Sequence, residues 1–228
     1  MLTPVVIVPS TPILVPSLVG TITNELTLLR NAVLTAAKSL PSRWLVISAN
    51  KNQCMLGAHK SGTFAGYGSD IIVTLSPKAK SKPVKLPLCA LIAGWIRDKV
   101  NPKAFLEINC YSSSYCEDIA LSIGNMLRSR INYLGSSIGV IVVADGLTTL
   151  SLDAPGGYIP DSVKIQNKLD GALSCGDLAS LISLSSSVYC RVVFQVLAGL
   201  SWPAPSQVHE LYRGAPYGVG YFVGKWEL

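Results

Sequence analysis

The stretch Gly139-Val140-Ile141-Val142-Val143 decides the fold class, because it is an unbroken apolar run in which every residue after the glycine is β-branched. Such a run is typical of a central strand in a parallel sheet that helices cover on both faces. A polar turn, Ala144-Asp145-Gly146, follows it directly. These residues predict an α/β fold with this strand in the interior of the sheet.

Other short apolar runs predict further strands. Each is rich in β-branched or aromatic side chains and is bounded by polar or turn-forming residues. On the N-terminal side, the predicted strands are 4–8, 44–47, 71–75 and 105–108. Near the other end, 208–212 and 219–226 predict two strands of a hairpin that are joined through 214–218.

Helix patterns alternate with these strands. Apolar residues at spacings of three and four positions predict amphipathic helices, and an S-x-x-E pattern predicts a capping box at a helix start. The predicted helices are 17–40, 88–99, the segment from the capping box at Ser114 and Glu117 to about Arg130, and 161–200 with breaks near Gly176 and Ser185.

This alternation predicts a single domain over residues 1–228. We expect three α/β/α layers, with a mostly parallel central sheet and a C-terminal β-hairpin, because helices have to cover both faces of a buried parallel sheet. No internal repeat appears in the sequence, and no linker separates two halves.

The composition excludes several classes of protein. Hydrophobic residues make up 49% of the chain and charged residues 14%, which excludes a disordered chain, a collagen-like repeat and a charged coiled coil. The mean hydropathy is +0.41, but no window offers about 18 uninterrupted apolar residues, so we expect no membrane span. The N-terminus has no basic segment and is broken by prolines, unlike a signal peptide. We expect a cytoplasmic protein.

The net charge of +6 is unevenly distributed. Residues 38–103 hold eleven lysines and arginines against two acids, Asp70 and Asp98. Clustered lysines can contact phosphates, but no aromatic residues interleave with this run to stack on bases. A solvated loop is therefore favoured, and no nucleic-acid partner is expected. The apolar composition keeps a homo-oligomer among the alternatives. The densest part of the basic run comprises Lys78, Lys80, Lys82 and Lys85.

The six cysteines show no metal-binding spacing. They lack a C-x-x-C pair, and the closest two in sequence, Cys110 and Cys116, match no zinc or iron–sulfur pattern. Cys89 and Cys190 lie in apolar stretches, where a thiol behaves as a small hydrophobic side chain. Reduced structural thiols are therefore expected.

The candidate site follows from where the strands end. In open α/β sheets, ligands bind outside the carboxyl ends of the strands. The predicted strands are followed there by hydroxyl, amide and carboxylate side chains, so we expect a cleft that hydrogen-bonds a small polar or aromatic ligand. The residues that we expect to line it are Ser10, Asn50, Asp145 and Thr149.

Common catalytic patterns are missing from the sequence. It contains no G-x-S-x-G nucleophile turn, no G-x-G-x-x-G dinucleotide loop and no phosphate-binding G-x-x-x-x-G-K-[ST] loop. Its two histidines, His59 and His209, are isolated from each other and from any metal-ligand spacing, and neither follows a predicted central strand. A surface or structural role is favoured for both.

Five segments together resemble the class III extradiol ring-cleavage dioxygenases of the protocatechuate 4,5-dioxygenase β-subunit type and the related Memo-like proteins. They match the family's proline-rich opening, the end of its second strand, its glycine–aromatic segment, its aspartate turn and its closing glycine-rich strand. The segments are Pro9 to Pro16, Ser48-Ala49-Asn50, Phe64-Ala65-Gly66-Tyr67-Gly68, Val143 to Thr149 and Ala215 to Tyr221.

This resemblance implies the fold described above and a lost metal site. Active members of the family hold non-haem Fe(II) with histidines and a carboxylate, and a further histidine serves as base. At the matching positions this chain has Ser10, Asn50 and Thr149, which are neutral side chains that bind iron poorly. The resemblance therefore implies a degenerate member without a metal cofactor or dioxygenase activity.

Several functions stay open on the sequence alone. A binding or interaction protein that uses the retained cleft is the leading hypothesis. A hydrolase or lyase centred on Asp145 is the second, and it requires His59 or His209 within hydrogen-bonding reach of that carboxylate. A structural homo-oligomer and a still active metal-dependent dioxygenase are the others.

Overall fold

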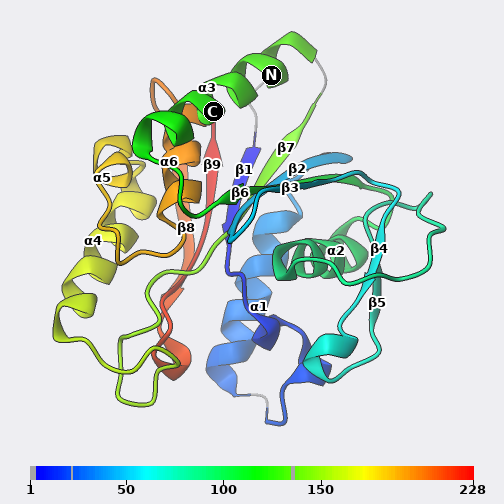
Figure 1. The fold of residues 1–228 in the computed structure, drawn as a ribbon, viewed down its shortest axis with the longest axis horizontal. Helices are drawn as coiled ribbons and strands as arrows, with labels where there is room; N and C mark the ends of the chain where they lie inside the picture. The colour runs from blue at the N-terminus through cyan, green and yellow to red at the C-terminus, as the bar shows by residue number, and fades with distance from the viewer. Residues whose placement is uncertain (1–3, 22, 135–136) are drawn as a thin grey trace.

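The computed structural model describes residues 4–21, 23–134 and 137–228. Its strands in the main sheet are β1 (Pro4–Val8), β2 (Arg43–Asn50), β3 (Cys54–Leu56), β6 (Phe105–Ser112), β7 (Gly139–Val143), β8 (Gln207–Gly214) and β9 (Tyr221–Glu227). They form one seven-stranded mixed sheet in the order β3-β6-β2-β7-β1-β9-β8 (Figure 1). The predicted α/β fold and the predicted C-terminal hairpin, β8–β9, are both confirmed.

The interior of the sheet is parallel. β6, β2, β7 and β1 run in the same direction. On one side β3 pairs antiparallel with β6. On the other side β9 pairs antiparallel with β1, and β8 pairs antiparallel with β9. Every residue of β7 is buried, as its uninterrupted β-branched sequence predicts. In the register, Val143 pairs with Val8 of β1 and with Ser48 of β2. The carboxyl ends of these three strands therefore lie side by side.

Helices cover both faces of the sheet, which gives the three expected layers (Figure 1). One hydrophobic cluster joins the sheet to α1 (Asn24–Ala37) and α2 (Leu88–Val100). The other joins it to the remaining helices of the described chain, which are α3 (Glu117–Leu134), α4 (Pro160–Cys175), α5 (Leu178–Ile182) and α6 (Arg191–Leu200).

The helix predicted over 17–40 begins later than expected. Residues Pro16–Leu18 form a single 3₁₀ turn, and α1 starts at Asn24. The reason is a cap: the Thr23 hydroxyl accepts a hydrogen bond from the Leu26 backbone N–H at 3.2 Å. Ile22, an apolar residue within the predicted helix 17–40, lies outside the described residues.

The predicted capping box is wrong, although the helix is present. α3 starts at Glu117 itself, which places Ser114 outside the first turn. The Ser114 hydroxyl instead lies 2.7 Å from that of Ser112. The breaks predicted in 161–200 are confirmed. Gly176 ends α4 with a φ of +72°, and residues 183–190 separate α5 from α6.

The predicted strand 71–75 lies outside the main sheet. The residues of this segment that form a strand, β5 (Ile72–Thr74), pair antiparallel with β4 (Ser61–Thr63) in a separate two-stranded sheet. Val73 and Leu75 are buried in the cluster that contains α2, so the apolar character of the segment reflects contact with that helix.

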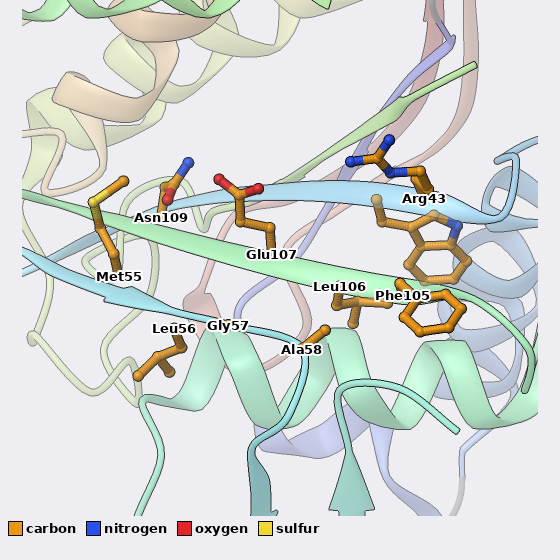
Figure 2. Close-up of a pocket in the computed structure, with 10 residues that line it drawn as sticks. Arg43, Met55, Leu56, Gly57, Ala58, Phe105, Leu106, Glu107 and Asn109 are labelled. Carbon is orange, nitrogen blue, oxygen red and sulfur yellow. The ribbon is translucent and has the colours of Figure 1, made fainter. Parts of the chain in front are cut away.

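The short strand β3 covers only part of the β6 edge. It pairs with β6 from Ile108 to Cys110, and the uncovered part borders a cavity of about 530 Å³ that Figure 2 shows. Its lining includes Met55, Phe105 and Glu107. The Glu107 carboxylate receives two hydrogen bonds from Arg130 of α3, at 2.6 and 2.7 Å.

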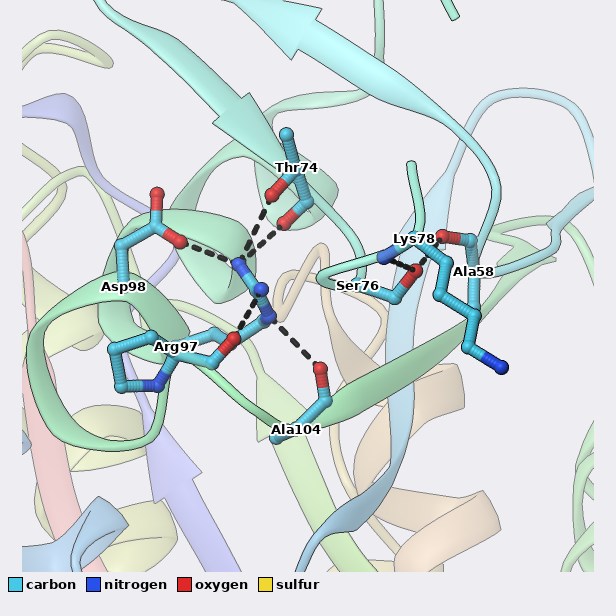
Figure 3. A network of polar contacts seen from close by, with 8 residues as sticks. Ala58, Thr74, Ser76, Lys78, Arg97, Asp98 and Ala104 are labelled. Carbon is cyan, nitrogen blue, oxygen red and sulfur yellow. Dashed lines mark hydrogen bonds and ion pairs between the residues drawn. The ribbon is translucent and has the colours of Figure 1, made fainter. Parts of the chain in front are cut away.

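Buried Arg97 connects α2 to its surroundings (Figure 3). Its guanidinium donates to the Ala104 carbonyl at 2.9 Å and to the Thr74 carbonyl at 3.1 Å, and it pairs with Asp98. A single side chain thus joins the end of α2, the strand β5 and the segment that leads into β6. This arrangement holds α2 in place over the sheet.

Two glycines allow α3 and α6 to pack in close contact. A Cβ at Gly199 would lie 2.5 Å from the Leu121 carbonyl oxygen, and one at Gly124 would lie 2.3 Å from that of Val196. Because backbone atoms cannot move aside as a flexible side chain can, we expect Gly199→Ala to lower the free energy of unfolding by about 3 kcal/mol. Urea unfolding followed by circular dichroism measures this change.

The matched control is Gly171→Ala on α4, where an added Cβ meets nothing within 4 Å. It should raise stability by about 0.5–1 kcal/mol, since alanine favours a helix over glycine. Equal effects of the two substitutions would contradict the assigned helix contact.

Candidate functional site

A pocket of about 480 Å³ lies where the carboxyl ends of β1 and β2 meet the N-terminus of α2. We call it the strand-end pocket. Its walls combine hydroxyl, amide, ammonium and thiol groups with several apolar side chains. They are formed by Ser10, Ser48, Ala49, Asn50, Tyr67, Lys85, Leu86, Pro87, Leu88 and Cys89.

The pleat of the strands explains which side chains reach this pocket. Val8 of β1 and Val46 of β2 both belong to the cluster beneath α1 and α2. Side chains two and four positions further along a strand point to the same face. Ser48 and Asn50 on β2, and Ser10 just after β1, are therefore placed toward α2. The Ser48 hydroxyl is fixed by a 2.7 Å hydrogen bond to the Val143 carbonyl.

The structure brings three of the four predicted site residues together. Ser10 and Asn50 both line the strand-end pocket. Asp145 does not line it but lies directly behind, where its Oδ1 accepts a hydrogen bond from the Ser10 backbone N–H at 2.8 Å. The Asn50 side-chain oxygen accepts from the Lys51 backbone N–H at 2.9 Å, which orients its amide.

Asp145 lies in an enclosed setting for a carboxylate. Burial raises its pKa to about 7, and the Ser10 hydrogen bond opposes that change only in part. Burial likewise raises the pKa of Cys190 to about 12, and the nearby charge of Asp145 adds to this effect. Tyr221, whose hydroxyl donates to Thr11 at 3.1 Å, also lies close enough for Asp145 to raise its pKa.

Thr149 is not brought to the pocket. Its hydroxyl lies 2.5 Å from that of Ser162 on α4, on the other side of the sheet from α2. The loop that follows β7 turns away toward β9, as the 2.8 Å hydrogen bond from the Gly146 N–H to the Gly220 carbonyl shows. The sequence could not reveal this turn, because it depends on contact with the C-terminal hairpin.

Neither histidine supports acid–base chemistry at Asp145. His59 and His209 are both exposed. The His209 ring lies on β8 and faces Gln207 at 3.4 Å. Among the residues that the structure describes, no hydrogen bond joins either imidazole to Asp145.

The residues present do not fit an iron centre. Within the described ranges, no three histidine, cysteine, aspartate or glutamate side chains are grouped so that they could hold a metal ion. Ser10 and Asn50, two of the three positions that the sequence resemblance aligns with metal ligands, offer only a hydroxyl and an amide in the pocket.

Most of the pocket residues were not predicted, and Tyr67 and Lys85 are the two among them that bear most on ligand chemistry. Tyr67 belongs to the glycine–aromatic segment, in which no site residue was predicted, and Lys85 ends the basic run, which was predicted to be a solvated loop. Lys78, Lys80 and Lys82 are exposed side chains that do not line the pocket. The cavity of Figure 2 is lined by none of the predicted site residues.

None of the described helices is long and apolar enough to cross a bilayer.

The environment of Asp145 predicts a pH dependence of stability. A carboxyl group whose pKa is higher in the folded than in the unfolded state binds its proton more tightly when folded. Its contribution is therefore complete below about pH 4 and is lost as the pH rises through about 7. The loss is on the order of 4 kcal/mol, since each pKa unit corresponds to about 1.4 kcal/mol.

Asp145→Asn should remove this loss while keeping an acceptor for the Ser10 N–H. Between pH 4 and pH 8, the unfolding free energy of the variant should increase relative to that of the native chain as the pH rises. The exposed Asp153 provides the control, and Asp153→Asn should leave the profile unchanged. Parallel profiles for Asp145→Asn and the native chain would contradict the raised pKa of this carboxyl group.

Comparison with known proteins supports the fold alone. No family model and no curated protein matches this sequence. Among solved structures, the chain is similar to the uncharacterized protein JW3007 from Escherichia coli K12, with a TM-score of 0.58. The match covers 98% of this chain and 99% of that one, at 12% sequence identity. The two chains therefore share an architecture from end to end.

Proposed function

We propose that this chain binds a small polar or aromatic ligand with an anionic group in the strand-end pocket. The observation that carries this proposal is that side chains from separate elements line the same pocket. Ser10 and Asn50 come from the ends of different strands, and they line one pocket together with Lys85 and Tyr67. Its volume of about 480 Å³ lies within the usual range for sites of small molecules.

The chemistry of the walls favours a ligand with two distinct ends. The Lys85 ammonium can pair with a carboxylate or phosphate, and the N-terminus of α2 adds a favourable dipole for negative charge. Leu86 and Pro87 offer apolar surface, and the Tyr67 ring can pack against an aromatic or aliphatic group. The Ser10 hydroxyl and the Asn50 amide supply hydrogen bonds that select orientation.

The resemblance of the sequence to extradiol dioxygenases is compatible with ligand binding in the strand-end pocket. Where active extradiol dioxygenases place iron-binding histidines, this chain places Ser10 and Asn50 in the pocket wall. We propose that the chain is a degenerate relative of that family, which kept the pocket at the strand ends and uses it for binding.

A second candidate function is acid–base catalysis by Asp145. The observation in its favour is a carboxyl group with a pKa of about 7 directly behind Ser10, since a group that titrates near neutrality can exchange protons efficiently. Ligand binding is the stronger proposal because Asp145 does not line the pocket. If catalysis occurs, Asp145→Asn should abolish turnover of a bound ligand without abolishing its binding.

Ligand binding is tested with a panel of small aromatic and aliphatic carboxylates, each matched to the corresponding primary amide. Saturation-transfer NMR identifies the binders, and calorimetry measures their affinity. We expect carboxylates to bind in preference to their amides. Lys85→Ala should weaken binding about tenfold or more, because a hydrogen bond to a charged group contributes about 1.5–3 kcal/mol.

Lys82→Ala is the matched control, since Lys82 belongs to the same basic run but does not line the pocket. It should leave the affinity within about twofold. Equal losses in the two variants would show that general positive charge, and not the strand-end pocket, attracts the carboxylates. Equal binding of acids and amides would rule out the anionic end of the proposed ligand.

A further inference from the structure

Two cysteines that are distant in the sequence meet behind the strand-end pocket. Cys89 is the second residue of α2, and Cys110 lies on β6. Their sulfur atoms are 3.3 Å apart, and both residues are free thiols. The side chains are nearly inaccessible, at 3% and 0% exposure. Oxidation together with a short movement would join these two sulfur atoms as a disulfide.

The surroundings make these two thiols chemically different. The hydrogen bond from Cys110 lowers the pKa of Cys89 against the effect of burial, with smaller contributions from Ser48 and from the backbone N–H groups of Ala90 and Cys89. A helix N-terminus is a setting in which thiolates are stabilised. The proximity of Cys89 and burial both raise the pKa of Cys110. Of the two thiols, Cys89 is therefore the one that loses its proton more readily.

Access distinguishes them as well. Cys89 lines the strand-end pocket, whereas Cys110 does not. A small molecule that enters the pocket from solvent therefore reaches Cys89 first. Cys110 lies directly behind it, in the position of a thiol that can react with whatever forms on the Cys89 sulfur.

We propose that Cys89 and Cys110 form a peroxide-reactive thiol pair, in which Cys89 attacks a small hydroperoxide and Cys110 resolves the product as a disulfide. In the first step the Cys89 thiolate attacks one peroxide oxygen. The O–O bond breaks and a sulfenic acid forms on Cys89. When the oxidant is hydrogen peroxide, the leaving oxygen takes up a proton and is released as water. The sulfur loses two electrons, and the peroxide gains them.

In the second step the Cys110 sulfur attacks the Cys89 sulfenic acid. The S–O bond breaks, the S–S bond forms, and the Cys110 proton leaves with the hydroxyl group as water. A disulfide is about 2.0 Å long, so the two sulfur atoms have to approach by little more than about 1 Å from their 3.3 Å separation. A dithiol reductant would return the pair to its starting state by exchange.

The remaining cysteines provide internal comparisons. Cys116 and Cys175 are exposed thiols, so simple accessibility would make them the first to be oxidised. Cys54 is half-buried and lies opposite Cys110 in the β3–β6 register, which makes it the alternative partner of Cys110. The proposal uses the pocket only as a route of access, so it stands or fails independently of the proposed ligand.

The test is a map of thiol oxidation in the native chain. Fully reduced protein is treated with one molar equivalent of hydrogen peroxide, and the remaining thiols are alkylated at set times. Chymotrypsin can cleave after Tyr111 and Tyr115, which separates Cys110 from Cys116 for mass spectrometry. We expect a Cys89–Cys110 disulfide to form about tenfold faster than oxidation of Cys175, despite the greater exposure of Cys175.

Variants test the order of the two steps. In Cys110→Ser, Cys89 should remain a sulfenic acid that dimedone traps, whereas in Cys89→Ser, Cys110 should stay a free thiol. Cys175→Ser is the matched control and should leave the Cys89–Cys110 map unchanged. Oxidation of Cys116 and Cys175 ahead of Cys89, or a Cys54–Cys110 disulfide in place of Cys89–Cys110, would overturn the proposal. The map of the native chain decides this even if a variant does not fold.

Discussion

The parallel pairing of β7 with β1 on one side and with β2 on the other is the constraint on which the candidate site depends. Val143 is in register with both Val8 and Ser48, and parallel strands present their carboxyl ends at one edge of a sheet. Ser10 and Asp145 can form their hydrogen bond only because this register holds. The helix α2, fixed at its far end by Arg97, then closes the pocket with its N-terminus.

Much of this arrangement could be predicted from the sequence, because buried strands and helices carry apolar residues in recognisable patterns. The run 139–143 predicted a central strand and the run 4–8 a further strand, and every residue of these two strands except Pro4 is buried. Elements whose position depends on distant contacts could not be predicted. β3 has only three residues and owes its pairing to the exposed β6 edge. The segment 71–75 is apolar because it packs on α2, and periodicity alone does not distinguish this from a place in the main sheet.

The same distinction applies to the site residues. That Ser10, Asn50 and Asp145 lie near one another could be predicted, because each lies at or just after the carboxyl end of a strand that the register aligns with its neighbours. Thr149 lies further along its loop, and its hydroxyl pairs with Ser162. The spacing of the cysteines could not predict the contact between Cys89 and Cys110, because this contact joins the start of the helix α2 to the strand β6 of the sheet. The sequence suggested inert thiols, whereas the geometry gives one of them access to a pocket.

A crystallographic soak of this chain with a panel of small aromatic and aliphatic carboxylates is the most direct test of ligand binding in the strand-end pocket, because it locates a bound molecule without assuming a reaction. We expect density in this pocket, with the carboxylate near Lys85 and the remainder between Tyr67 and Leu86. Occupation of only the β6-edge cavity beside Met55 and Phe105, or of neither cavity, would contradict it.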